Sequence, residues 1–239
     1  MDNIEKYNHI LIKAFIKNQK QQEILVRKQG LIQQVYDYYN FVPNSELFIG
    51  FNPAILKTKS NKSYIIGVSK EDFICLQDLG CQSQRLESME QLEAGVDTAI
   101  SGDEFFTFLI DETLQRQFLT SLRRVLTHMC ITTLKDYKNQ DFKDREFSFP
   151  LIVKHDKDYE IYLEHHNHDL NLRNSWDTTV YSFNKTEHNV YGPFARRAVY
   201  FKQLAKFTSD AGFNDFVVHK NLMYKSLIRK NYEHVISFG

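Results

Sequence analysis

Apolar side chains recur at helical spacing over the first forty or so residues. The span 3–39 carries an apolar stripe made of Ile24, Leu25, Leu31, Ile32, Val35, Tyr36 and Tyr39. This periodicity predicts helical structure, which we divide into two helices. Pro43 and Asn44 then end the helical pattern.

From residue 46 to 134 short apolar runs alternate with helical segments. The predicted strands are 46–50, 64–68, 81–86, 96–100 and 129–134, and the predicted helices are 52–57, 70–79 and 105–126. Asn52 is expected to cap the first of these helices, with Pro53 in its first turn. Ser69 is expected to cap the second, with Asp72 at the third helical position and Gly80 at its end. Strands that alternate with helices predict an α/β fold with a mostly parallel sheet and helices on both faces.

The alternation ends at residue 135. The polar stretch 135–193 contains two strand-like runs, 159–164 and 178–183, which are predicted to form a hairpin with a loop rich in His and Asn. An amphipathic helix is predicted over 194–211, followed by strands at 215–219 and 232–238 that pair antiparallel at the sheet edge. We therefore divide the chain into an N-terminal helical extension, 1–44, and an α/β domain, 45–239, with the insertion 135–193.

This order of elements resembles the class I S-adenosylmethionine-dependent methyltransferases over about residues 45–239. In that family a glycine-rich turn after the first strand lets the backbone approach the methionine part of the cofactor. Gly50 matches the first glycine of the turn, whereas Phe48 stands where an acidic residue is usual and Asn52 where a second glycine is usual. The resemblance implies a Rossmann-like methyltransferase fold with an antiparallel last strand, and S-adenosylmethionine as cofactor. The chain also resembles small methyltransferase-like proteins of tailed phages.

The resemblance also implies roles for residues after the second and fourth strands. Ser69 aligns with the acidic residue that holds the ribose hydroxyls, and Glu71 is a nearby carboxylate that could replace it. Asp103 and Glu104 follow the fourth strand, where the family's substrate meets the sulfonium. The implied cofactor-binding residues are Phe48, Gly50, Asn52, Ser69, Glu71 and Asp103.

Acid–base chemistry at this edge would come from Asp103, Glu104 and Lys135. A carboxylate can accept hydrogen bonds from an amine or take a proton from a hydroxyl. Lys135 follows the fifth strand, at the edge where open α/β sheets bind ligands, and could orient a phosphate or activate a hydroxyl. The alternatives remain open: one carboxylate could cap a helix that begins near Phe105, and Lys135 could belong to a solvated loop.

Composition and cysteine usage describe a folded protein of a reducing compartment. Of the 239 residues 42% are hydrophobic and 25% are charged, which excludes a largely disordered chain. Cys75, Cys81 and Cys130 lack metal-ligand spacing and lie in apolar runs, where free thiols act as small hydrophobic groups. The sequence also lacks a run of about 18 apolar residues. We expect a cytoplasmic protein without a membrane segment.

The zero net charge hides segregation along the chain. Lys and Arg number 10 against 5 acidic residues in 1–70, 1 against 11 in 71–112, and 8 against 3 in 194–239. The basic C-terminal segment 194–239 also contains aromatic residues, a combination that can bind a nucleic acid. The alternative is that these charges pair across the fold.

Metal binding is a weaker hypothesis. The run 164–169 contains three histidines and two carboxylates, but its spacing matches no common metal site, so a polar hairpin tip is the favoured interpretation and no metal is predicted.

Two functional hypotheses follow. The first is an S-adenosylmethionine-dependent methyltransferase of unknown acceptor, with nucleic acid as one candidate. The second is a catalytically inactive methyltransferase-like module that binds a partner or has a structural role. The altered glycine turn and Ser69 favour the second hypothesis, and the acidic residues after the fourth strand favour the first. The sequence does not indicate the oligomeric state.

Overall fold

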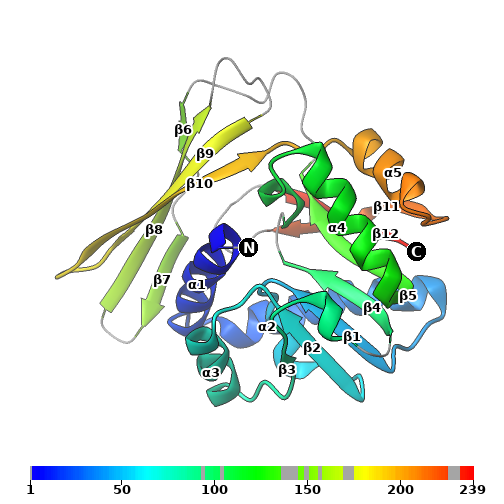
Figure 1. Ribbon diagram of the computed structural model, residues 1–239. Helices are drawn as coiled ribbons and strands as arrows, with labels where there is room; N and C mark the ends of the chain where they lie inside the picture. The colour runs from blue at the N-terminus through cyan, green and yellow to red at the C-terminus, as the bar shows by residue number, and fades with distance from the viewer. Residues whose placement is uncertain are drawn as a thin grey trace.

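The computed structural model contains two β-sheets, and five α-helices pack against or beside them in the part of the chain that it describes (Figure 1). The structure describes residues 2–92, 95–102, 105–135, 145–147, 151–155, 158–168, 175–225 and 232–239.

The larger sheet has seven strands in the order β11-β12-β5-β4-β1-β2-β3. Their bounds are β1 Ser45–Ile49, β2 Lys62–Ile66, β3 Gln84–Arg85, β4 Val96–Ser101, β5 Leu126–Leu134, β11 Phe216–Lys225 and β12 Tyr232–Phe238. Strands β1 to β5 are parallel, and β12 runs antiparallel to both of its neighbours, β5 and β11. The predicted α/β class, with a mostly parallel sheet and an antiparallel last strand, is confirmed.

The helices lie near the predicted spans, but the predicted helix 52–57 is a 3₁₀ turn and the other bounds differ in detail. The α-helices are α1 Asp2–Ile16, α2 Gln21–Tyr39, α3 Lys70–Asp78, α4 Glu112–Val125 and α5 Phe201–Asp210, and the 3₁₀ turns are η1 Pro53–Lys57, η2 Met89–Gln91 and η3 Phe105–Phe108. Both predicted caps are confirmed: the Asn52 side chain accepts a hydrogen bond from Ala54 N–H, and Ser69 accepts one from Asp72 N–H, each at 3.1 Å.

The single helix predicted over 105–126 is wrong. A 3₁₀ turn, η3, precedes a shorter helix, and the Asp111 side chain caps that helix by accepting a hydrogen bond from Leu114 N–H at 2.8 Å. Strand β5 begins directly after the helix, at Leu126. Asp is a favoured N-cap residue because its side chain accepts a hydrogen bond from a backbone N–H in the first turn. Helix α4 therefore begins directly after Asp111 rather than at Phe105.

The smaller sheet is formed by the insertion and the residues after it. Its order is β10-β9-β8-β6, and β7 also pairs with β8; the bounds are β6 Arg145–Phe147, β7 Leu151–His155, β8 Asp158–His168, β9 Ser175–Phe183 and β10 His188–Arg197. The predicted hairpin is confirmed by the antiparallel pairing of β8 with β9. The run rich in histidine lies inside β8 as far as His168, and was wrongly assigned to a loop.

Residues 194–197 were also wrongly predicted as helix, since they belong to β10. Phe194 pairs with Thr178, and Arg196 pairs with Trp176 of the neighbouring strand. Phe194 and Arg196 are buried, whereas Ala195 and Arg197 between and after them are partly exposed. This alternation of buried and partly exposed residues is the pattern of a strand. It places the large side chains of Phe194 and Arg196 in the interior of the protein.

Helix α1 joins the two sheets. The Tyr7 hydroxyl donates to Glu164 of β8 at 2.5 Å, and its ring lies 4.9 Å from that of Phe108 in η3. Arg196 of β10 is 1% exposed, donates to the Thr107 hydroxyl from Nε at 2.9 Å, and lies 4.5 Å from the centre of the Phe108 ring. Arg196 is therefore buried, and it does not contribute to a phosphate-binding surface of the basic C-terminal segment.

The described helices include none that is both long enough and apolar enough to cross a bilayer.

The cysteines differ in accessibility. Cys81 and Cys130 are buried, which fits the role of small hydrophobic groups, and burial raises the pKa of the Cys130 thiol far above its ordinary value. Cys75 is exposed on α3, although it lies in an apolar run of the sequence, so it does not act there as a small hydrophobic core group.

We predict that native protein reacts rapidly with DTNB at Cys75 alone, because the thiolate is the nucleophile and buried thiols stay protonated. Absorbance at neutral pH should give one fast equivalent, against three in denaturant for the three cysteines of the sequence. Cys75→Ser should remove the fast phase; a fast phase that survives this substitution would contradict the burial of Cys81 and Cys130.

Candidate functional site

The turns after β1, β2 and β4 meet at the carboxyl edge of the seven-stranded sheet, which is where open α/β folds bind ligands. Gly50 N–H donates to the Ile66 carbonyl at 2.9 Å, and Gly102 N–H donates to the Ile49 carbonyl at 2.7 Å. Gly50 has φ +76° and Gly67 has φ +74°, a region of backbone space that favours glycine. The predicted bend after the first strand therefore exists and lies directly beside Gly102.

The N-terminal helix covers this bend. Asn8 of α1 donates from Nδ2 to the Gly67 carbonyl at 2.7 Å, and its Oδ1 accepts from Phe51 N–H at 3.0 Å. A Cβ on Gly50 would lie 3.0 Å from Asn8 Nδ2. One carboxamide thus satisfies a backbone donor and a backbone acceptor of two turns and occupies the space in front of Gly50. Sequence reasoning missed Asn8 because nothing in a helical pattern reveals a contact with residues more than forty positions away.

The end of β2 carries a second cluster of polar side chains. The Ser69 hydroxyl donates to Asp72 Oδ2 at 2.8 Å, and His9 Nδ1 lies 2.7 Å from Asp72 Oδ1. Asp72 is buried, whereas the side chain of Glu71 is exposed. With Glu5 and Tyr191 among its other lining residues, this cluster borders a cavity of about 420 Å³ between α1 and β10. Of these two carboxylates, Asp72 is the one that bonds Ser69, the residue that aligns with the family's ribose-binding position.

A buried lysine lies at the same edge of the sheet. Lys28 of α2 is 4% exposed and lines a small cavity of about 20 Å³ together with Asn52, Ser101 and Thr132. Ser101 and Thr132, on adjacent strands, share a hydrogen bond of 2.6 Å between their hydroxyls. Lysine side chains are seldom buried. A buried lysine at the edge where this fold binds ligands is therefore a candidate for a functional residue. The available signal is that Lys28 falls within the apolar stripe of α2, four residues after Ile24 and four before Ile32.

The remaining predicted site residues occupy different places. Asp103 and Glu104 lie outside the described residues, and they directly follow Gly102 in the sequence. Lys135 is partly buried at the end of β5, on the same edge. The Asn52 side chain caps η1, and the Phe48 side chain is buried and lines a cavity beneath α2 rather than the bend.

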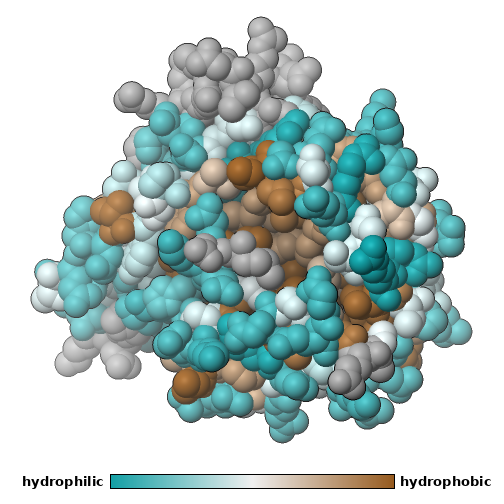
Figure 2. Space-filling view, in the orientation of Figure 1, coloured by the Kyte–Doolittle hydropathy of each residue, from teal (hydrophilic) through white to brown (hydrophobic). Residues whose placement is uncertain are grey.

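Figure 2 shows a depression with hydrophobic walls in the middle of one face, between α1 and α4 in the orientation of Figure 1, with a hydrophilic rim. In the part of the chain that can be described, no cluster of three or more His, Cys, Asp or Glu residues is arranged to hold a metal ion. His166 instead lies 3.2 Å from Glu164 within β8. The candidate site at the carboxyl edge consists of the glycine turns, Asn8, the Asp72 cluster and Lys28.

The basic segment 194–239 is partly engaged in internal contacts. Besides the buried Arg196, Arg197 lies 3.5 Å from Glu112 in an ion pair. Nucleic-acid binding by the remaining cations stays a prediction.

This strand order, with its antiparallel seventh strand and a glycine turn at the carboxyl edge, is the Rossmann-like fold of S-adenosylmethionine-dependent methyltransferases, and solved structures agree. Streptomyces venezuelae DesVI is similar with a TM-score of 0.70 and 10% identity, over 90% of this chain and 91% of that chain. The sugar N-methyltransferase KedS8 from Streptoalloteichus sp ATCC 53650 gives 0.69 and 8% identity, over 92% and 89%. A methyltransferase from Clostridium acetobutylicum ATCC 824 gives 0.65 and 12%, over 89% of each chain.

No protein-family model matches the sequence, and a search of curated proteins found no match. At these identities the similarity to solved structures establishes the fold, and a fold alone does not fix a function.

We predict that Asn8→Ala destabilises the protein by about 1–3 kcal/mol, because it leaves a buried N–H and a buried carbonyl without partners. Urea unfolding followed by circular dichroism measures the change. Asn3→Ala, at an exposed position of the same helix, is the matched control and should change stability by less than about 0.5 kcal/mol. Equal effects of the two substitutions would show that the Asn8 contacts contribute nothing.

Proposed function

We propose that this protein is an S-adenosylmethionine-dependent methyltransferase whose cofactor site is the bend at Gly50 and the adjoining turns of β2 and β4. The observation that carries the proposal is the left-handed Gly50 at the carboxyl edge of a sheet with the methyltransferase strand order. The similarity of the fold over about nine-tenths of the chain supports it.

The chemistry of the bend fits the cofactor's amino-acid end. That end carries an ammonium donor and a carboxylate acceptor, and the bend offers the Gly67 carbonyl and the Phe51 N–H. Asn8 pairs with both groups, so its side chain must turn away before a ligand can replace it. The blocking atoms are the far end of a flexible side chain, and such a rearrangement does not require the backbone to move.

Other residues would hold the rest of the cofactor. Ser69 and Asp72 present hydroxyl and carboxylate oxygens at the end of β2, where the ribose hydroxyls would donate. The cofactor supplies an electrophilic methyl group when bound. The chain's own task is to hold the acceptor at near-attack distance and to exclude water.

The acceptor would lie in the hydrophobic depression between α1 and α4 (Figure 2). Asp103 and Glu104, which follow Gly102, are the proposed groups that accept hydrogen bonds or a proton from its amine or hydroxyl, and Lys135 is proposed to orient it. We propose a small-molecule acceptor, since KedS8 is a sugar N-methyltransferase; a nucleic acid bound by 194–239 is the alternative acceptor.

A second candidate function is a methyltransferase-like module that has lost the cofactor and serves as a binding or structural unit. The specific observation in its favour is again Asn8, which fills the space in front of Gly50. Calorimetric titration with S-adenosylhomocysteine distinguishes the two candidates.

We predict saturable one-to-one binding of S-adenosylhomocysteine to the wild type, and about tenfold tighter binding to Asn8→Ala, because removing an internal competitor raises the population of the open site. Adding Gly50→Ala to Asn8→Ala should abolish binding, since the new Cβ narrows the groove. Thermal melts of each variant establish that it is folded.

Absence of binding to both the wild type and Asn8→Ala at millimolar ligand would reject the enzyme and favour the inactive module. Binding that is weaker in Asn8→Ala would show that Asn8 holds the ligand rather than competing with it.

A further inference from the structure

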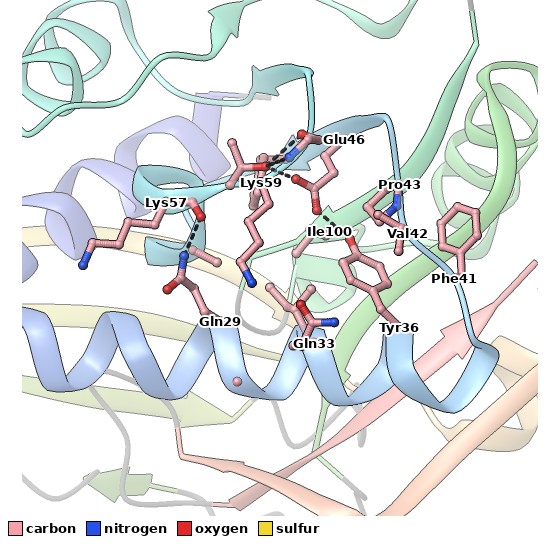
Figure 3. A pocket seen from close by; sticks show the side chains of 16 residues that line it. Gln29, Gln33, Tyr36, Phe41, Val42, Pro43, Glu46, Lys57, Lys59 and Ile100 are labelled. Atoms are coloured by element: carbon pink, nitrogen blue, oxygen red, sulfur yellow. Dashed lines mark hydrogen bonds between the residues drawn. The ribbon is translucent and has the colours of Figure 1, made fainter.

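A cavity of about 530 Å³ lies away from the bend, between α2, η1 and β1 (Figure 3). Its origin is the connection between β1 and β2, residues 50–61, whose one described helical element is the 3₁₀ turn η1. Parallel strands are usually joined by a crossover that contains an α-helix, which covers the sheet. Here α2 covers this face instead, and a space remains between α2 and η1.

The floor of the cavity is apolar. Ile32 of α2, Phe48 of β1 and Ile100 of β4 contribute buried side chains to it. Volumes of about 300–1,000 Å³ with mostly apolar walls and a few fixed polar groups are typical of sites for small molecules.

One carboxylate is built into the wall. Glu46 is 4% exposed, and it accepts a hydrogen bond from the Tyr36 hydroxyl at 2.6 Å and another from the Thr58 hydroxyl. Burial, together with the nearby Glu46, raises the pKa of Tyr36 well above its ordinary value, so the phenol remains a donor. A carboxylate has about four acceptor positions, which leaves capacity for a donor on a ligand.

One cation extends over the cavity. Figure 3 shows the Lys59 side chain extending from the segment after η1 toward α2, whereas Lys57 points away. Lys57 donates to Gln22 Oε1 at 3.2 Å. For Lys59 the described residues provide no carboxylate within ion-pair distance. The mouth of the cavity therefore carries a positive charge that can meet an anion.

A glycine forms part of the cavity wall. Gly30 lies in the interior of α2 and lines the cavity, and a Cβ there would meet no atom within 4 Å. Glycine destabilises a helix interior relative to alanine, and neither the backbone nor the packing requires it here. A larger side chain at this position would have free space to extend into, so a substitution at Gly30 can be used to fill part of the cavity.

We infer that this cavity binds a small amphipathic anion. Its apolar body would lie on Ile32, Phe48 and Ile100, its anionic group would meet Lys59 at the mouth, and a hydrogen-bond donor on it would face Glu46. The inference does not depend on the bend at Gly50 or on methyl transfer.

Two fluorescent probes test the charge requirement. 8-Anilinonaphthalene-1-sulfonate has aromatic rings, an N–H donor and a sulfonate, and N-phenyl-1-naphthylamine is the same molecule without the sulfonate. The wild type should bind each at one site, with the sulfonate probe bound more tightly. Lys59→Gln should weaken binding of the sulfonate probe about threefold and leave the neutral probe unchanged. Equal weakening of both probes would overturn the role of Lys59.

Two substitutions at Gly30 test the location. Gly30→Leu should place its side chain in the cavity and weaken both probes at least tenfold, whereas Gly30→Ala should keep most of the binding. Both variants should melt at or above the wild-type temperature, because both residues favour helix more than glycine does. Unchanged probe binding by folded Gly30→Leu, or no saturable binding by the wild type, would overturn the proposal.

Discussion

The packing of α1 between the two sheets is the constraint on which the rest of the structure depends. Asn8 bonds the backbone of the turns after β1 and β2, and one residue earlier Tyr7 bonds Glu164 of the smaller sheet. Near the other end of the helix Lys17 pairs with Glu160 of the same strand. Because α1 and the residue that follows it contact both sheets, the smaller sheet is fixed in position relative to the carboxyl edge of the larger one.

That constraint connects the fold to the site. A helix that seals a glycine turn removes polar backbone groups from water, and each such group needs a partner. Asn8 supplies both partners from a single side chain, so it stabilises this edge, and under the proposed function it competes with the cofactor for the same groups. If the proposal holds, the stability of the bend and its affinity for the cofactor are opposed at one residue.

Local signals predicted much of the fold. Asn52 and Ser69 were identified as caps because a cap bonds a backbone N–H two or three residues away, so sequence spacing alone reveals it. The apolar periodicities of strands and helices are also local, so their alternation along the chain predicted the parallel sheet. By contrast, residues 194–197 were assigned to a helix because the partners that make them a strand, Thr178 and Trp176, lie about twenty residues away.

The candidate site was less predictable because its members come from distant segments. Gly50 was identified by resemblance and lies at the predicted edge, while Asp103 and Glu104 keep their predicted roles as part of the proposal. The sequence analysis did not identify Asn8 or Lys28. Each is one polar residue on an otherwise apolar helical face, and its contacts become apparent only when that face packs on the carboxyl edge of the sheet.

Helix α2 lines two separate cavities. Lys28 and Ile32 lie one turn apart on it, and Ile32 and Ile100 line both the small cavity at the carboxyl edge and the larger cavity beneath η1. The usual cover for this face of a parallel sheet is an α-helix in the connection, and α2 takes that place here. The short connection between β1 and β2 is thus compensated by α2, which brings Lys28 to the carboxyl edge and leaves the larger cavity between itself and η1.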